Sequence, residues 1–205
     1  MKKSLLILFT IILAMLMLSA CGKKENNPNT VIQYLKSLNT YTCDVTIHIK
    51  NSRQEIDMET KLVYHKDFGH RLEVNKERVL IYKENEVRIS DLVNNMDYTL
   101  DNKFDQVYKL SFIQQYIGLL YTDEEIKNTF KKIEDREYQL ISLDIPGNNR
   151  NMNKAIMYVD IETKLPSKLS IYDNKDNEVI SYIYTNFVPN AEINEEIFNQ
   201  KVTKE

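Results

Sequence analysis

The stretch YTCDVTIHIK, residues 41–50, decides the fold class because its side chains alternate strictly between apolar and polar. The positions on the apolar side are Tyr41, Cys43, Val45, Ile47 and Ile49. A period of two is typical of a β-strand with one buried face. A second alternating run, residues 56–64, follows the turn residues Asn51 and Ser52. The two runs therefore predict a β-hairpin.

Similar short runs separated by polar turns continue on both sides of a different middle segment. The further predicted strands are Arg71–Asn75, Arg78–Lys83, Glu86–Asp91, Met96–Leu100, Tyr138–Ile145, Ala155–Ile161, Lys168–Tyr172 and Val179–Phe187. Short strands at this spacing are typical of an antiparallel meander. The sequence therefore predicts a mainly β domain.

Helical periodicity interrupts the strands in three places. Thr30 could cap a short helix with apolar Ile32, Leu35 and Leu38, which Asn39 ends. In the middle, one helical face carries Phe104, Val107, Leu110, Ile113, Ile117 and Leu120. A second helix is predicted from a Thr122/Glu125 capping box and an apolar stripe of Ile126, Phe130 and Ile133. Residues 190–202 are expected to form a short helical or irregular cap ending with Phe198. We therefore expect a strongly curved antiparallel sheet with helices at its concave mouth.

The N-terminus predicts export and lipid anchoring. Lys2 and Lys3 precede an uncharged apolar run that ends in Leu18-Ser19-Ala20-Cys21, the pattern of a bacterial lipoprotein cleavage site. The run is shorter than the roughly 20 apolar residues of a spanning helix, which leaves an uncleaved anchor as the less favoured alternative. We expect a signal peptide over 1–20, lipidation of Cys21, a tether over 21–29 and one domain over 30–205. Such a protein would lie on the outer leaflet of the cytoplasmic or forespore membrane.

The net charge and the absence of known catalytic motifs argue against several classes of function. The net charge of −3 argues against a nucleic-acid-binding protein, and loss of Lys2 and Lys3 with a signal peptide would make the chain more acidic. The sequence contains neither a G-x-S-x-G elbow nor a P-loop. The acidic run Asp123-Glu124-Glu125 is better explained by a helix N-terminus than by a pair of catalytic carboxylates. We therefore expect no catalytic residues, no cofactor and no enzymatic activity.

The histidines and the second cysteine are expected to be structural. None of His48, His65 and His70 belongs to an H-E-x-x-H pair, so we expect no metal site and solvated imidazoles. Cys43 shares the apolar side of its strand, where it would be a small buried hydrophobic residue. With Cys21 acylated it would also be the only free thiol, which leaves an intermolecular disulfide as its functional alternative.

The sequence offers three candidate binding surfaces. The stripe Val107, Leu110, Ile113, Ile117 and Leu120 could seal the sheet or present an apolar groove to a ligand, and sealing is favoured. Thirteen tyrosines could form a sugar-binding face, although those in predicted strands are expected to pack in the core or at its rim. An open strand edge could dock a partner protein, or a second copy of the chain by strand exchange.

The segments AIMYVD (155–160), TKLP (163–166) and YTNF (184–187), with Ile193 and Phe198, resemble the LolA superfamily of lipoprotein carriers over about residues 30–202. The resemblance implies a half-open barrel of about eleven antiparallel strands with an apolar cavity beneath helical lids. Within the superfamily the chain is most similar to clostridial spore-germination lipoproteins of the GerS type. That similarity implies binding and activation of CwlD, a zinc amidase that modifies the spore cortex. The alternative is a carrier or sensor of lipid or lipoprotein acyl chains.

Overall fold

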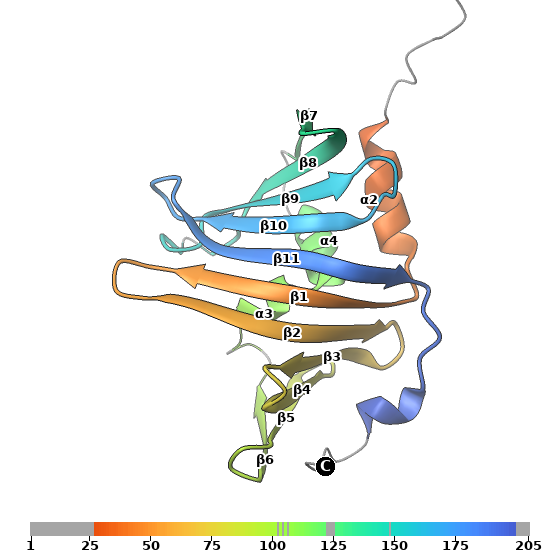
Figure 1. Cartoon of the computed structure of the whole chain (residues 1–205), viewed down its shortest axis with the longest axis vertical. Coiled ribbons are helices and arrows are strands. Elements are labelled where there is room, and N and C mark those ends of the chain that lie inside the picture. Colours follow the sequence, from red (N-terminus) through yellow and green to blue (C-terminus); the bar gives the residue numbers. More distant parts are fainter. Residues whose placement is uncertain are drawn as a thin grey trace, which may run out of the picture.

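The computed structural model describes residues 27–199 except 102, 104, 106, 122–125 and 148. Its main element is one open antiparallel sheet in the order β6-β5-β4-β3-β2-β1-β11-β10-β9-β8-β7 (Figure 1). The strands are Thr40–Lys50 (β1), Glu55–His65 (β2), Gly69–Val74 (β3), Arg78–Tyr82 (β4), Glu86–Asp91 (β5), Met96–Asp101 (β6), Lys127–Ile133 (β7), Arg136–Asp144 (β8), Lys154–Asp160 (β9), Pro166–Tyr172 (β10) and Glu178–Pro189 (β11). The mainly β class and the eleven strands are confirmed, and the sheet is not closed into a barrel.

The centre of the sheet is the pairing of β1 with β11, which joins two meanders. Val45 lies opposite Tyr184 and Ile47 lies opposite Tyr182. Along β1 the first eight residues alternate between half-buried and buried, as residues 41–50 predicted. One meander, β1 to β6, continues from one side of this pair, and the other, β7 to β11, from the other side.

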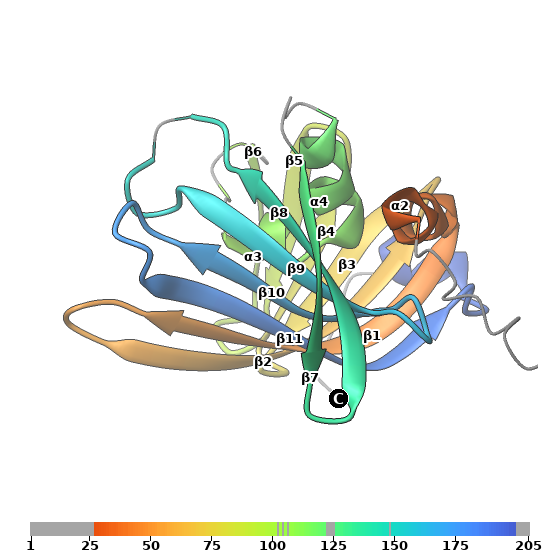
Figure 2. The same cartoon turned by 90° about the horizontal axis from the view of Figure 1, so that it is seen from above.

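Three α-helices lie on the concave side of the curved sheet (Figure 2). They are Pro28–Ser37 (α2), Val107–Leu110 (α3) and Ile113–Leu120 (α4). The predicted Thr30 cap of the first helix is wrong: the N-cap is Asn27, three residues earlier, and its side chain accepts from the Asn29 N–H. Pro28 explains this start, because its fixed φ suits the first helical turn and its missing N–H costs nothing there.

The predicted helix around Ile126–Ile133 is wrong, because this segment forms the edge strand β7. Its capping box, Thr122 and Glu125, lies outside the described residues. Phe130 pairs with Gln139 of β8, and the Gln139 amide donates to Asn128 at 2.8 Å. The pairing with β8 supplies the backbone hydrogen bonds, so the helical spacing of the three apolar residues does not decide the structure.

The main core lies between the concave face and the helices, and a smaller cluster lies elsewhere on the sheet. In that second cluster Phe198 is fully buried against Val79 and Ile81 and stacks on Phe68 at 5.9 Å. Phe198 closes a 3-10 helix, Glu195–Phe198 (η2). The expected short cap ending with Phe198 is confirmed for the residues described.

Candidate functional site

The predicted long central helix is broken into α3 and α4, which together we call the helical lid. At the break, Phe112 has an extended backbone (φ −82°, ψ 122°), and the N–H of Ser111 donates to Tyr108 rather than one residue further back. Two tyrosines of β11 donate hydrogen bonds to backbone carbonyl oxygens, one in α3 and one at the break. The Tyr182 hydroxyl donates to Val107 at 2.7 Å, and the Tyr184 hydroxyl donates to Ser111 at 2.9 Å.

Two more tyrosines fix α4 against the sheet. The Ile113 N–H donates to the Tyr41 hydroxyl at 3.3 Å, and the Tyr116 hydroxyl donates to the Ile141 carbonyl at 2.7 Å. Burial raises the pKa values of Tyr41, Tyr182 and Tyr184 far above the ordinary tyrosine value. These hydroxyls therefore keep their protons, and each buried polar group in these contacts has a partner.

The predicted apolar stripe faces the core through most of its length. Leu110, Ile113, Ile117 and Leu120 are at most 6% exposed, while Val107 is half-buried against the core. Phe104, which completed the predicted stripe, lies outside the described residues. An aspartate starts the lid: Asp105 accepts from the N–H groups of Val107 and Tyr108 and from the Tyr82 hydroxyl at 2.5 Å. This arrangement is typical of a sealed interior.

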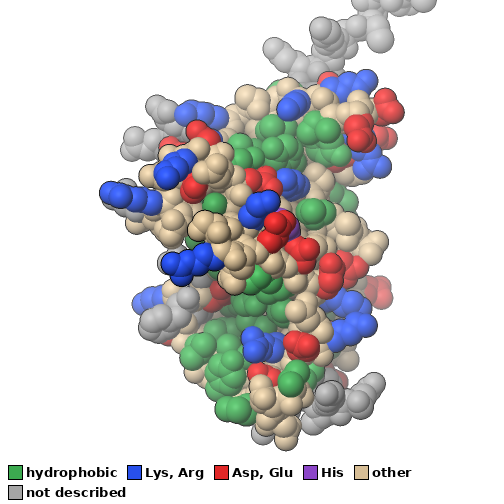
Figure 3. Space-filling model, turned by 60° about the vertical axis from the view of Figure 1, so that its left-hand side comes forward, with side chains coloured by type: hydrophobic (Ala, Val, Ile, Leu, Met, Phe, Trp, Pro, Cys, Tyr) green, Lys and Arg blue, Asp and Glu red, His purple; other side chains and the backbone are tan. Residues whose placement is uncertain are grey.

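The inner face of β4 to β6 is an apolar surface whose side chains are buried on β4 and β5 and exposed on β6, and we call it the β6 groove. It contains a hollow of about 260 Å³. The apolar side chains lining the hollow are Leu80, Tyr82, Val87, Ile89, Tyr98, Leu100 and Tyr108. Every residue of β6 is exposed, and the alternating Met96, Tyr98 and Leu100 are 58%, 40% and 45% exposed. Figure 3 shows hydrophobic side chains gathered toward the lower end of the molecule, where β5 and β6 lie in Figure 1.

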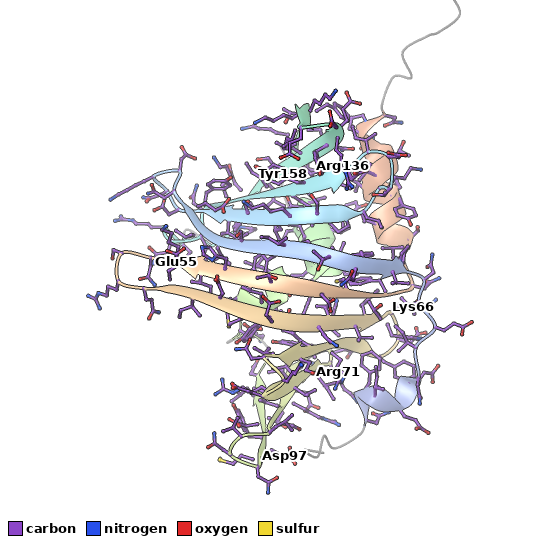
Figure 4. All side chains as sticks on the ribbon, in the orientation of Figure 1. Glu55, Lys66, Arg71, Asp97, Arg136 and Tyr158 are labelled. Atoms are coloured by element: carbon purple, nitrogen blue, oxygen red, sulfur yellow. The ribbon has the colours of Figure 1, made fainter. Side chains whose placement is uncertain are left out.

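The two edges of the sheet differ in character. The β7 edge carries Lys127, Lys131 and Lys132, and lysines are a common protection of free edges against pairing. The β6 edge carries Asp97 and Asp101 on one side and the apolar β6 groove on the other; Asp97 is labelled at this end of the sheet in Figure 4. Neither strand has an outer neighbour among the described residues. The β6 edge therefore combines free backbone groups with apolar side chains.

The three histidines have different surroundings. His48 is on the polar side of β1, where its Nε2 lies 3.0 Å from a carboxylate oxygen of Glu55 and its Nδ1 contacts the Asp57 carboxylate. His65 is half-buried beside Phe68. In the part of the chain that the structure describes, no three His, Cys, Asp or Glu side chains are grouped as a metal site would need.

His70 is not the solvated residue that the sequence predicted. It is half-buried at the start of β3, and its ring stacks on Phe112 with centroids 4.0 Å apart and planes 7° apart. Burial lowers its pKa to about 3, although Gln114 opposes this shift. The imidazole is therefore neutral at physiological pH. The sequence signal that could have found it is its register: His70 lies in one cross-strand row with Tyr64 and Tyr82.

Cys43 is 3% exposed in the core, and burial raises the pKa of its thiol. An intermolecular disulfide would require this thiol to become exposed. We expect native protein with Cys21 lipidated or replaced by serine to show almost no reaction with a thiol reagent over minutes, and full reaction of Cys43 in denaturant. Rapid stoichiometric labelling of native protein would contradict this burial.

Cys21 and the predicted signal peptide lie outside the described residues. Within the described part of the chain, no helix has both the length and the apolar character needed to cross a bilayer.

Comparison with known proteins places the chain in a family. One similar solved structure is an uncharacterized conserved protein from Thermus thermophilus, with a TM-score of 0.58 and 8% identity over 88% of this chain and 95% of that one. Another is a chain in the structure of the CwlD amidase from Clostridioides difficile in complex with the GerS lipoprotein, with a TM-score of 0.49 and 20% identity over 80% of this chain and 95% of that one. A third is the LolA superfamily protein NE2245 from Nitrosomonas europaea, with a TM-score of 0.41 and 8% identity over 84% of this chain and 97% of that one. The Thermus likeness concerns the fold alone. A search of curated protein sequences finds no significant match. The family described as "Sporulation protein YdcC-like" matches residues 1–198, and the chain belongs to that YdcC-like sporulation family.

Proposed function

We propose that this protein is a membrane-anchored, non-enzymatic lipoprotein that binds a partner protein at its β6 edge. The observation that carries the proposal is the combination, on one strand, of a free backbone edge and three exposed apolar side chains, Met96, Tyr98 and Leu100. An added strand could pair its backbone with β6 while its side chains enter the β6 groove. The lipid on Cys21 would hold this surface near the outer leaflet.

The proposed partner is a spore cortex N-acetylmuramoyl-L-alanine amidase of the CwlD type. The membership in a sporulation family supports this choice. The chain would act by positioning or stabilising the amidase and would carry out no chemistry itself. The zinc chemistry would belong to the partner.

The test is co-purification of the amidase with variants of the two edges. Replacing both Tyr98 and Leu100 with lysine should weaken amidase binding by about 30-fold or more, because a buried aromatic anchor at an interface is commonly worth about 2 kcal/mol or more. The matched control is Phe130→Lys, which changes a similarly exposed aromatic residue, 43% exposed, on the β7 edge. This control should bind normally.

Three outcomes would contradict the proposal. Loss of binding in the β7 control alone would place the partner at the other edge. Full binding by the β6 variant would exclude the β6 groove. A stoichiometric lipid found by native mass spectrometry, without amidase, would favour the acyl-chain carrier instead. Light scattering on the wild type reports whether a second copy of the chain occupies the same edge.

A further inference from the structure

The start of α2 is attached to the β7 end of the sheet by a buried glutamine of β8. The Gln139 side-chain amide donates to the Pro28 carbonyl at 2.9 Å and to the Asn128 side chain of β7 at 2.8 Å. Figure 1 shows this end of the sheet at the top and β6 at the bottom, and Figure 2 views the β7 end from above. The segment that precedes α2 is therefore joined to the domain beside β7.

The predicted lipid anchor belongs to that preceding segment. Cys21 is six residues before Asn27, the first residue that the structure describes. An extended chain spans at most about 3.3–3.6 Å per residue, so an acylated Cys21 cannot lie more than about 20 Å from Asn27. The edge strand β6 is at the other end of the eleven-stranded sheet. A lipid on Cys21 would therefore hold the β7 end close to the bilayer.

Apolar side chains are exposed at this end of the sheet. Ile126, Phe130 and Ile133 are between 36% and 43% exposed. Phe130 lies opposite Gln139 in the β7–β8 register, which places it next to the start of α2. Protection of a free edge explains lysines, but it does not explain exposed apolar side chains, which favour pairing with another chain. An aromatic and two aliphatic side chains beside lysines are typical of a surface that contacts the boundary between lipid headgroups and acyl chains.

The lysines of β7 have free ammonium groups. Lys127, Lys131 and Lys132 are exposed and form no ion pair with any residue that the structure describes. The strand itself contains no acidic residue, and Glu134 and Asp135 lie in the turn that follows it. A lysine can lay its apolar stem along a surface while its ammonium group reaches a phosphate. Near an anionic membrane, each lysine strengthens binding by about fivefold.

We infer that β7, together with Ile126, is the surface by which this protein lies on the bilayer, and that it contacts anionic phospholipid headgroups. Phe130 and Ile133 would lie at the level of the headgroups, where water and headgroups hydrogen-bond the free backbone groups of the strand. The lysines would contact the lipid phosphates. The β6 edge would point away from the bilayer and remain accessible. The inference rests on the lipid anchor of the proposed function and does not depend on the amidase.

The test uses the absence of tryptophan from the chain, because a single introduced tryptophan is then the only indole reporter. The full chain carrying Phe130→Trp is purified with its lipid and reconstituted in phosphatidylglycerol vesicles with brominated acyl chains, which quench indole fluorescence on contact. We expect at least about twofold quenching. The matched control is Tyr98→Trp, a similarly exposed aromatic residue of β6, which should show almost no quenching.

The possible failures of this test are distinguishable. Membrane-bound protein with no quenching at residue 130, or with equal quenching at residues 98 and 130, would overturn the orientation and leave amidase binding untouched. Protein recovered only in the soluble fraction would remove the anchor, and with it both this inference and the anchored form of the proposed function.

A second variant tests the choice of anionic lipid. In the Phe130→Trp chain, glutamine replaces the three lysines of β7, which should lower the equilibrium constant for contact by about 100-fold. Quenching should then fall to the level of the Tyr98→Trp control. Glutamine at three exposed lysines elsewhere on the sheet, Lys61, Lys66 and Lys76, should leave quenching unchanged. Full quenching in a β7 variant that melts normally, or equal quenching in vesicles of neutral phosphatidylcholine, would overturn the role of anionic headgroups.

Discussion

Replacing Gly69 with alanine is expected to destabilise the protein by about 2–5 kcal/mol, combining left-handed backbone strain with overpacking. Gly69 has φ +90°, and a Cβ built on it would lie 2.1 Å from the carbonyl oxygen of Tyr82. That oxygen belongs to the backbone of the neighbouring strand, so a rotamer change cannot relieve the clash. Urea unfolding followed by circular dichroism measures the change.

Two other glycines provide matched controls for this prediction. Gly147 also has a positive φ, +112°, but no atom lies within 4 Å of a Cβ placed there. Gly147→Ala should therefore cost only the backbone strain, about 1–2 kcal/mol. Gly118 lies in α4 with open space around it, so Gly118→Ala should be neutral or stabilising by up to about 1 kcal/mol. Equal effects at Gly69 and Gly147 would show that β3 and β4 can move apart at little cost.

The second large effect is expected from pH. His70 has a folded pKa of about 3, well below its ordinary value near 6.5, so between these values the unfolded chain binds one more proton than the native protein. Stability due to the neutral imidazole is therefore present above pH 6.5 and is lost as the pH falls. Between pH 7 and pH 5 this residue should cost about 2 kcal/mol of unfolding free energy.

The control is His70→Phe, which keeps an aromatic ring against Phe112 and cannot be protonated. Its unfolding free energy should change less between pH 7 and pH 5 than that of the wild type. Carboxylates contribute mainly below this range, since their ordinary pKa values are near 4, and they are common to both proteins. Parallel curves for the two proteins over this range would mean that His70 remains accessible to protons in the native state.

The strands were the most predictable part of the fold, because burial of one face imposes a period of two. Glu86–Asp91 has the predicted bounds, and β1 differs by one residue at its start. The edge strand β7 could not be found this way. Nearly all of its residues are exposed, so neither face selects apolar side chains, and Ile126, Phe130 and Ile133 fall by chance at helical spacing.

The break in the central helix was also beyond local sequence reasoning. The apolar stripe continues through it, with Leu110 and Ile113 both buried. The groups that hold the broken ends are Tyr182 and Tyr184, more than seventy residues away in the chain. A pattern that considers one segment at a time cannot include their hydroxyl groups. Packing of the tyrosines was expected correctly; their hydrogen bonds to the lid were not.

The candidate binding surface also has one part that the sequence predicts and one part that it does not. The open strand edges followed from the antiparallel meander, but the contrast between a lysine-rich β7 and an apolar β6 requires knowing which strands are terminal. His70 looks like a solvated turn residue until its cross-strand neighbours, Tyr64 and Tyr82, are known. Register and topology, rather than composition, determine both features.

The β1–β11 pairing has a consequence for how the chain is made. The first meander is complete once β6 has been synthesised. The edge of β1 that faces away from β2, however, has no hydrogen-bonding partner until β11, residues 178–189, has been made. Pairing between such distant segments is slow because the intervening chain must first be ordered. The pairing of β1 with β11, which joins the two meanders, is therefore the expected rate-limiting step of folding. A nascent chain released before Glu178 would retain a long unpaired β1, the kind of intermediate that chaperones must shield from aggregation.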